Sequence, residues 1–190
     1  MKLLFATQNK HKAKELDLLV PDAISILSLN DIGCTAEIAE TGNSFEENAK
    51  IKADWVRKKY GLDCFADDSG LEIEALGGAP GIYSARYGGP ERDMEKNIQK
   101  VWDKLQGHSN TRAWFRTVFY LHLEGKEYVF RGRVEGSIVF EKRGKNGFGY
   151  DPIFVPKGYR ETFAELGDTI KNKIGHRALA TQSLLKVLSR

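Results

Sequence analysis

Short apolar runs alternate with longer amphipathic stretches in the first half of the chain. A short continuous apolar run bounded by polar residues is typical of a buried β-strand. Runs of this kind occupy residues 3–6 and 64–66, and Ile24, Ile26 and Leu27 suggest a further strand. Residues 71–75 alternate apolar and acidic side chains, as a half-exposed strand does. The polar segment 67–70 is therefore predicted to be the loop in which the strand before it ends.

Apolar side chains at helical spacing predict four helices, at residues 13–20, 45–60, 90–106 and 178–188. The second has the clearest boundaries. Ser44 and Glu47 form a capping-box sequence at its start, and Gly61 suits the left-handed residue just past a helix end. The third helix is predicted to begin with Pro90, because proline is favoured in the first turn of a helix.

The second half of the chain is rich in aromatic and β-branched residues. Segments 113–123 and 128–140 flank Glu124-Gly125-Lys126 and predict a β-hairpin. A glycine-rich loop over 143–151 and a short strand over 153–155 follow. Because strands alternate with helices early and pair as a hairpin late, the sequence predicts an α/β fold with a mixed sheet.

Length and composition agree with one globular domain over residues 1–190. The chain has no repeat or linker, and with 41% hydrophobic and 29% charged residues it resembles globular proteins rather than disordered ones. No apolar run approaches the roughly 20 residues of a membrane span or the apolar core of a signal peptide, so we expect a cytoplasmic protein without a membrane partner. Cys34 and Cys64 could pair, but two cysteines do not make a disulfide scaffold in a chain of this length. Neither lies in a CxxC motif or near clustered histidines, which excludes a thiolate zinc site.

The net charge of +3 is too small to indicate nucleic-acid binding, but the distribution of charge is informative. Residues 1–14 and 171–190 carry lysines and arginines and no acids, whereas acids gather at 37–47 and 67–74. Basic ends around an acidic centre suit a polyphosphate bound together with a divalent cation. Solvated helix faces explain the same pattern equally well.

Residues 7–12 lie between a predicted buried strand and a predicted helix, where α/β proteins commonly bind ligands. A helix N-terminus offers amide N–H groups to phosphate, and Lys10 and Lys12 add positive charge. The chain contains neither GxxxxGK[ST] nor GxGxxG, which disfavours the two commonest nucleotide-binding folds. An ordinary turn between strand and helix is the alternative.

Carboxylates beside the 64–66 strand are candidate metal ligands. Asp67 and Asp68 follow that strand directly, and Glu40 ends a separate acidic segment. Mg²⁺ prefers one or two carboxylates together with oxygens of a substrate phosphate. A solvated turn is the alternative interpretation of residues 67–70.

Residues 147–152, Gly-Phe-Gly-Tyr-Asp-Pro, form the most distinctive part of the glycine-rich loop. Two glycines let the backbone approach a ligand while Phe148 offers a ring for stacking, and Asp151 would accept a hydrogen bond from the edge of that ligand. A tight aromatic corner packed on the core is the alternative. Further candidate donors to carbonyl or phosphate oxygens lie near the start of the last predicted helix: Lys171, His176 and Arg177.

Five motifs along the chain, taken together and in their order, resemble those of the ITP/XTP/dITP pyrophosphatase family. The set comprises Thr7-x-Asn9-x-x-Lys12, ADDSGL at 66–71, LGGAPGIYSARY at 76–87, the loop 147–151 and Lys171-x₄-His176-Arg177. The two central motifs are specific, whereas the first and last are weak alone. The resemblance runs from Leu4 to the last helix, and the family hydrolyses nonstandard purine nucleoside triphosphates to the monophosphate and pyrophosphate.

The resemblance implies an elongated mixed sheet flanked by helices, with two lobes and an active-site cleft between them. It also implies Mg²⁺ as cofactor, a homodimer, and a purine nucleoside triphosphate as substrate. Asp68 matches the family's proton acceptor, and Glu40 and Asp68 match its metal ligands. The implied substrate contacts are Thr7, Gln8, Asn9, Lys10, His11, Lys12, Ser69, Phe148, Gly149, Tyr150, Asp151, Lys171, His176 and Arg177.

The chain departs from the family at Gly175, where a serine commonly precedes His-Arg. Any hydrogen bond from that hydroxyl to the base is missing here. Donors near the base are expected to match the six-position oxygen of hypoxanthine or xanthine and to oppose the amino group of adenine.

Two alternatives stay open. One is a pyrophosphatase for pyrimidine or other modified nucleotides. The other is a non-enzymatic module that binds nucleotides or RNA, against which the carboxylates argue because they repel phosphate unless a cation intervenes.

Overall fold

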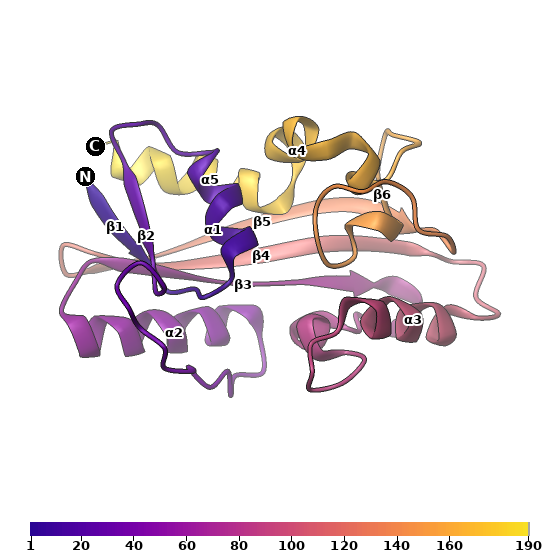
Figure 1. The fold of residues 1–190 in the computed structure, drawn as a ribbon, viewed down its shortest axis with the longest axis horizontal. Coiled ribbons are helices and arrows are strands. Elements are labelled where there is room, and N and C mark those ends of the chain that lie inside the picture. The colour runs from indigo at the N-terminus through magenta and orange to yellow at the C-terminus, as the bar shows by residue number, and fades with distance from the viewer. Residues whose placement is uncertain (190) are drawn as a thin grey trace. The chain divides into compact units, whose positions relative to one another are not determined.

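The computed structural model describes residues 1–189, which form a six-stranded mixed sheet with helices on its faces (Figure 1). The strand order is β2-β1-β3-β4-β5-β6. β1 pairs parallel with β2 and β3, and β5 pairs antiparallel with β6. The predicted α/β fold with a mixed sheet is therefore confirmed. The strands are β1 (Lys2–Phe5), β2 (Ser25–Ser28), β3 (Cys64–Ile73), β4 (Arg112–Leu123), β5 (Lys126–Ile138) and β6 (Phe154–Pro156). The helices are α1 (Lys10–Asp17), α2 (Phe45–Tyr60), α3 (Met94–Leu105), α4 (Phe163–Ile174) and α5 (His176–Leu188).

The chain divides into two compact units. The first unit contains residues 1–68, 117–132 and the chain from Arg177 onward, and the second contains residues 69–116 and 133–176. The single pyrophosphatase domain and the cleft expected from the sequence stay predictions. None of the helices within residues 1–189 combines the length and the apolar character needed to cross a membrane.

In the first unit the strands are buried on both faces. Leu3 and Phe5 pack with side chains of α1 and α5, whereas Leu4 and Ala6 pack with side chains of α2. Successive side chains of a strand point to opposite faces, so a continuous apolar run can fill both layers. Figure 1 shows α2 on one face of these strands and α1 and α5 on the other.

The boundaries of α2 confirm the sequence prediction. The Ser44 hydroxyl accepts a hydrogen bond from the Glu47 amide at 3.1 Å, and Gly61 ends the helix in the left-handed conformation at φ +67°. The Glu47 carboxylate accepts from the Asn43 amide at 2.7 Å rather than from the Ser44 amide of a full capping box. The first helix ends at Asp17, earlier than the predicted stop at residue 20.

The loop predicted at 67–70 is wrong, because β3 continues without a break from Cys64 to Ile73. Asp67 and Asp68 are interior strand residues that are only 1% and 6% exposed. Their carboxylates have polar partners on both sides of the sheet, Lys12 of α1 for Asp67 and Asn48 of α2 for Asp68. A strand can contain buried acids when such partners offset the cost of their desolvation.

The second unit has its own apolar core, and α3 and α4 cover opposite faces of its strands (Figure 1). The start of α3 differs from the prediction at Pro90. Asp93 caps the helix by accepting from the Lys96 amide at 3.0 Å, and Arg92 has a left-handed φ of +56°, so the helix begins at Met94.

One helix, α4, was not predicted from the sequence. Thr162 and Glu165 form a complete capping box at its start. The placement of Lys171 near the start of the last helix is wrong, since Lys171 lies in α4 and the last helix begins at His176. The predicted hairpin of β4 and β5 is present, with left-handed φ values at Glu124 and Gly125.

Candidate active site

Charged side chains of the first unit gather around Asp67. Its carboxylate lies 2.8 Å from Lys12 Nζ and 3.8 Å from Arg177 Nε. Burial alone would raise the pKa of Asp67, but Lys12, Lys52 and Arg177 outweigh that effect and hold the pKa well below its usual value. Arg177 also reaches Glu15 of α1, with Nη1 2.6 Å from Oε2. We call the following residues the charged cluster: Lys12, Glu15, Glu40, Lys52, Asp67, Asp68 and Arg177.

Lys52 of α2 is a member of the charged cluster that the sequence analysis missed. Its Nζ lies 2.5 Å from Oε1 of Glu40, and the side chain is buried. Burial lowers the pKa of Lys52, yet the carboxylates of Asp67, Asp68 and Glu40 raise it overall, so the ammonium stays charged. Burial raises the pKa of Glu40, and Lys52 brings it below its ordinary value. In the sequence Lys52 is one of several lysines in an amphipathic helix, and only the tertiary contacts distinguish it.

Asp68 differs electrostatically from its neighbour Asp67. The Asn48 amide donates to Asp68 Oδ2 at 3.0 Å. Burial and the negative charge of Glu40 raise the pKa of Asp68 to about 6, although Lys52 and Lys12 act in the opposite direction. A nearby cation would favour the charged form of this buried carboxylate, and carboxylate oxygens are the ligands that Mg²⁺ prefers.

Residues 7–12 build the turn between β1 and α1. Asn9 caps α1, because its Oδ1 accepts from the amides of His11 at 3.0 Å and Lys12 at 3.3 Å. The Thr7 hydroxyl accepts from the Asn9 amide at 3.2 Å, and the Gln8 side chain donates to the carbonyls of residues 34 and 36. Of the predicted contacts in this segment, only Lys12 joins the charged cluster, while Lys10 and His11 are exposed.

In the second unit, residues 147–151, which we call the base loop, are held by Asp151. Its Oδ2 accepts from the Phe148 amide at 2.9 Å and from Lys171 Nζ at 2.6 Å, and both charged side chains are buried. Lys171 Nζ also lies 4.7 Å from the centre of the half-buried Phe148 ring. The structure therefore gives Asp151 a role in holding the loop and Lys171 together, in addition to the contact with ligand expected from the sequence.

The remaining predicted contacts have varied surroundings. The Tyr150 ring is buried in the core of the second unit, and its hydroxyl donates to the Ser84 carbonyl at 2.6 Å. The buried His176 ring stacks on Phe115 with 5.0 Å between centroids. Ser69 is half-buried in β3 beside Asp68. The interpretation of the loop as an aromatic corner therefore applies to Tyr150, whereas Phe148 keeps part of its ring accessible.

Gly175 is confined by the backbone of α4. Its φ of −66° is open to any residue, but a Cβ would lie 2.5 Å from the Lys171 carbonyl oxygen. We expect Gly175→Ser to lower the free energy of unfolding by about 1–3 kcal/mol and to raise the KM for nucleotide, because Lys171 must shift. Thermal unfolding and steady-state kinetics measure both effects. Gly175→Ala is the matched control. An equal loss of stability in both variants assigns the effect to Cβ, whereas a loss of stability in the serine variant alone would contradict a clash at Cβ.

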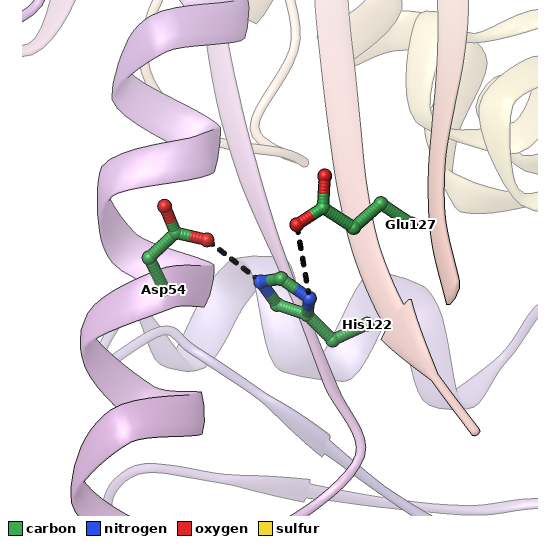
Figure 2. A group of neighbouring side chains, drawn as sticks. All are labelled: Asp54, His122 and Glu127. Carbon is green, nitrogen blue, oxygen red and sulfur yellow. Dashed lines mark hydrogen bonds and ion pairs between the residues drawn. The ribbon is translucent and has the colours of Figure 1, made fainter. Parts of the chain in front are cut away.

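A third group of titratable side chains, Asp54, His122 and Glu127, links α2 to the hairpin of the first unit (Figure 2). His122 Nε2 lies 2.7 Å from Asp54, and Nδ1 lies 3.8 Å from Glu127. The two carboxylates thus face different nitrogens of one ring. Lys50 Nζ already neutralises both, at 3.1 Å and 3.7 Å, while lying over the Tyr120 ring. We therefore interpret this group as a surface ion-pair network rather than a metal centre.

Comparisons with known proteins agree with this fold over nearly the whole chain. Residues 3–187 match the Ham1 family. A dITP/XTP pyrophosphatase of Christiangramia forsetii is 52% identical over 190 residues and covers 100% of both chains. One of Bacillus subtilis is 47% identical and covers 97% of this chain and 96% of its own. The structure of the Staphylococcus aureus Ham1 protein has a TM-score of 0.89 at 37% identity, and that of a HAM1 protein from Coxiella burnetii 0.90 at 40%, each covering 100% of this chain and 98% of its own. The chain belongs to the Ham1 family.

Proposed function

We propose that this protein is a nucleoside triphosphate pyrophosphatase that hydrolyses dITP, XTP and ITP to the monophosphate and pyrophosphate. A relative named dITP/XTP pyrophosphatase is 52% identical over the full chain. The observation that carries the proposal is the contrast between two adjacent carboxylates. Asp67 is neutralised by three cations, whereas Asp68 keeps a raised pKa of about 6 in the same charged cluster.

The charge balance of the charged cluster supports a requirement for Mg²⁺. Its carboxylates outnumber its cations, so a polyphosphate would meet net negative charge there without a further cation. Glu40 and Asp68 would hold Mg²⁺, because both are carboxylates and the negative charge of Glu40 is close enough to raise the pKa of Asp68. When bound, Mg²⁺ neutralises phosphate charge and polarises phosphoryl oxygens.

The protein's own groups then have distinct roles in hydrolysis. Lys12, Lys52 and Arg177 bind phosphate oxygens, and Asp67 keeps Lys12 and Arg177 in place through its ion pairs. Asp68 orients the attacking water as much as it accepts its proton, because a cation held at this carboxylate would lower the raised pKa that burial gives it. The water oxygen bonds to the α-phosphorus, and pyrophosphate leaves with the electron pair of the broken bond between the α-phosphorus and the oxygen that bridges it to the β-phosphorus.

The base loop supplies recognition of the purine. The accessible part of the Phe148 ring offers a stacking surface, and Lys171 beside it is a donor for a carbonyl oxygen. Adenine has an amino group where hypoxanthine and xanthine have that oxygen. In ATP this amino group would face the Lys171 ammonium, so two donors would meet and the binding free energy would be weaker by about 1–3 kcal/mol per unpaired group. We also propose a homodimer, on the basis of the family resemblance, and the cytoplasmic location expected from the sequence.

A substrate panel tests this proposal. The kcat/KM values for ITP, XTP, dITP, ATP and GTP are measured with Mg²⁺, and we expect ITP to exceed ATP by about 100-fold, as two unpaired groups would produce. A preference for pyrimidine or other modified nucleotides would favour the related pyrophosphatase alternative. Binding without turnover of any nucleotide would overturn the enzymatic proposal in favour of a binding module.

A further inference from the structure

The base loop has a partner outside itself in Met94, the first residue of α3. The Gly149 amide donates a hydrogen bond to Met94 Sδ, with 3.1 Å between nitrogen and sulfur. A thioether sulfur is a weak acceptor, and the unbranched methionine side chain adopts many conformations at little cost. An oxygen acceptor can therefore replace Met94 at this amide.

The Gly149 amide differs in this respect from its neighbours in the base loop. The Phe148 amide donates to the Asp151 carboxylate at 2.9 Å, and the Asp151 amide donates to the Phe148 carbonyl at 3.2 Å. Both acceptors are oxygens that belong to the loop, and Asp151 is buried. Exchange of a partner at Phe148 or Asp151 would disrupt the loop, whereas exchange at Gly149 leaves its internal hydrogen bonds intact.

Both partners of this contact are accessible. Gly149 adopts a left-handed φ of +62°, and the position of a side chain on it is open, with no heavy atom within 4 Å. Met94 is 45% exposed, so its side chain can move aside into solvent. Its backbone is fixed meanwhile, because Asp93 caps the helix at the preceding position.

We propose that Met94 is a specificity-determining residue that limits how strongly bases with a carbonyl oxygen are preferred, because it competes with them for the Gly149 amide. This inference rests on the proposed function of the base loop. A base that presents a carbonyl oxygen displaces the weak thioether and receives the hydrogen bond. A base that presents an amino group there cannot accept from the amide, so it gains nothing from displacing Met94.

Two substitutions change the competitor in opposite directions. Met94→Leu keeps the apolar volume and removes the acceptor, so the KM for ITP should fall, whereas Met94→Gln brings a strong oxygen acceptor to the amide, so that KM should rise. A single hydrogen bond predicts changes of about 2- to 12-fold. The kcat for ITP should stay within about twofold, because the reacting groups are untouched. The inhibition constant of ATP against ITP hydrolysis should not follow either change.

A second readout does not depend on turnover. Hydrogen exchange of the Gly149 amide, followed by NMR, should be faster in Met94→Leu and slower in Met94→Gln than in the natural protein. Glu95→Gln is the matched control in the same helical turn, where Glu95 pairs with Lys142 at 2.5 Å. It should leave the KM for ITP and the exchange of Gly149 unchanged.

The outcomes separate this inference from the proposed function. If Met94→Leu and Met94→Gln both keep the natural KM for ITP while the natural protein still prefers ITP to ATP, the inference fails and the proposed function stands. If Met94→Gln weakens ITP and ATP equally, Met94 is only a packing residue and the inference fails. If the natural protein does not hydrolyse ITP at all, both fail together.

Discussion

Asp68→Asn is expected to reduce pyrophosphate release from ITP by at least about 100-fold, the lower end of what a general base contributes, while the protein unfolds at or above its natural temperature. Asparagine keeps the shape of the side chain, and its oxygen can still accept from Asn48, which donates to Asp68 at 3.0 Å. It cannot accept a proton from water or provide a carboxylate for Mg²⁺.

The expected stability follows from the sign of the pKa shift. The pKa of Asp68 is raised from 3.8 to about 6 in the folded protein, so the charged carboxylate lowers the free energy of unfolding at neutral pH by about 3 kcal/mol at most. Loss of that charge therefore costs no stability. Asp54→Asn is the matched control, since Asp54 is 44% exposed and lies in the surface ion-pair network of Figure 2. A stable Asp68→Asn protein with more than about a tenth of the natural rate would remove Asp68 from the mechanism.

Asp67→Asn is expected to have the opposite effect on the fold, although the two positions are adjacent. Asp67 is 1% exposed and lies between Lys12 and Arg177, so its neutralisation removes the carboxylate that pairs with Lys12 and leaves Arg177 with Glu15 alone of its two carboxylate contacts. Removing one partner of a buried ion pair costs about 3–5 kcal/mol. For a chain of this length, that loss lowers the melting temperature by about 10 °C. Urea unfolding at pH 7 measures it, with Asp54→Asn expected to lose less than about 1 kcal/mol.

The pH dependence provides a second test of Asp67. Its pKa in the folded protein lies below the ordinary value of 3.8, so its ion pairs stabilise the fold fully above that pH and progressively less as the pH falls below it. The difference between the natural protein and Asp67→Asn should therefore shrink between pH 4 and more acidic solutions. An equal difference at pH 7 and at about pH 3 would show that the lost stability comes from packing rather than from charge.

The sequence predicts well where local signals and burial agree. The buried strand before Thr7 is predicted from its own apolar residues, and the ends of α2 are predicted from Ser44 and Gly61. Both predictions are confirmed, because each depends only on residues close by in the sequence. Alternation of strands and helices likewise predicts the mixed sheet. In each case the helix or strand is stabilised by contacts between neighbouring residues or by burial of regularly spaced apolar side chains, and both can be recognised in the sequence.

The sequence fails where distant partners change the meaning of a residue. Asp67 and Asp68 resemble a turn because two adjacent acids rarely lie inside a strand. The cost of burying their carboxylates is offset by hydrogen bonds from Lys12 and Asn48, which are far away in the sequence. Lys52 is indistinguishable from surface lysines until Glu40 is brought to it. The missed helix α4 had a local signal in Thr162 and Glu165, but Gly167, at φ +71°, interrupts its helical geometry.

The products formed from ITP by the natural protein test the central claim most directly. IMP, pyrophosphate and phosphate are quantified by ³¹P NMR with Mg²⁺ present, after its removal by a chelator, and after its return. We predict one pyrophosphate for each IMP, no phosphate, loss of turnover without Mg²⁺ and recovery when Mg²⁺ is restored. Release of phosphate with formation of IDP, or undiminished turnover after the chelator, would contradict the assignment of the charged cluster as a Mg²⁺-dependent pyrophosphatase site.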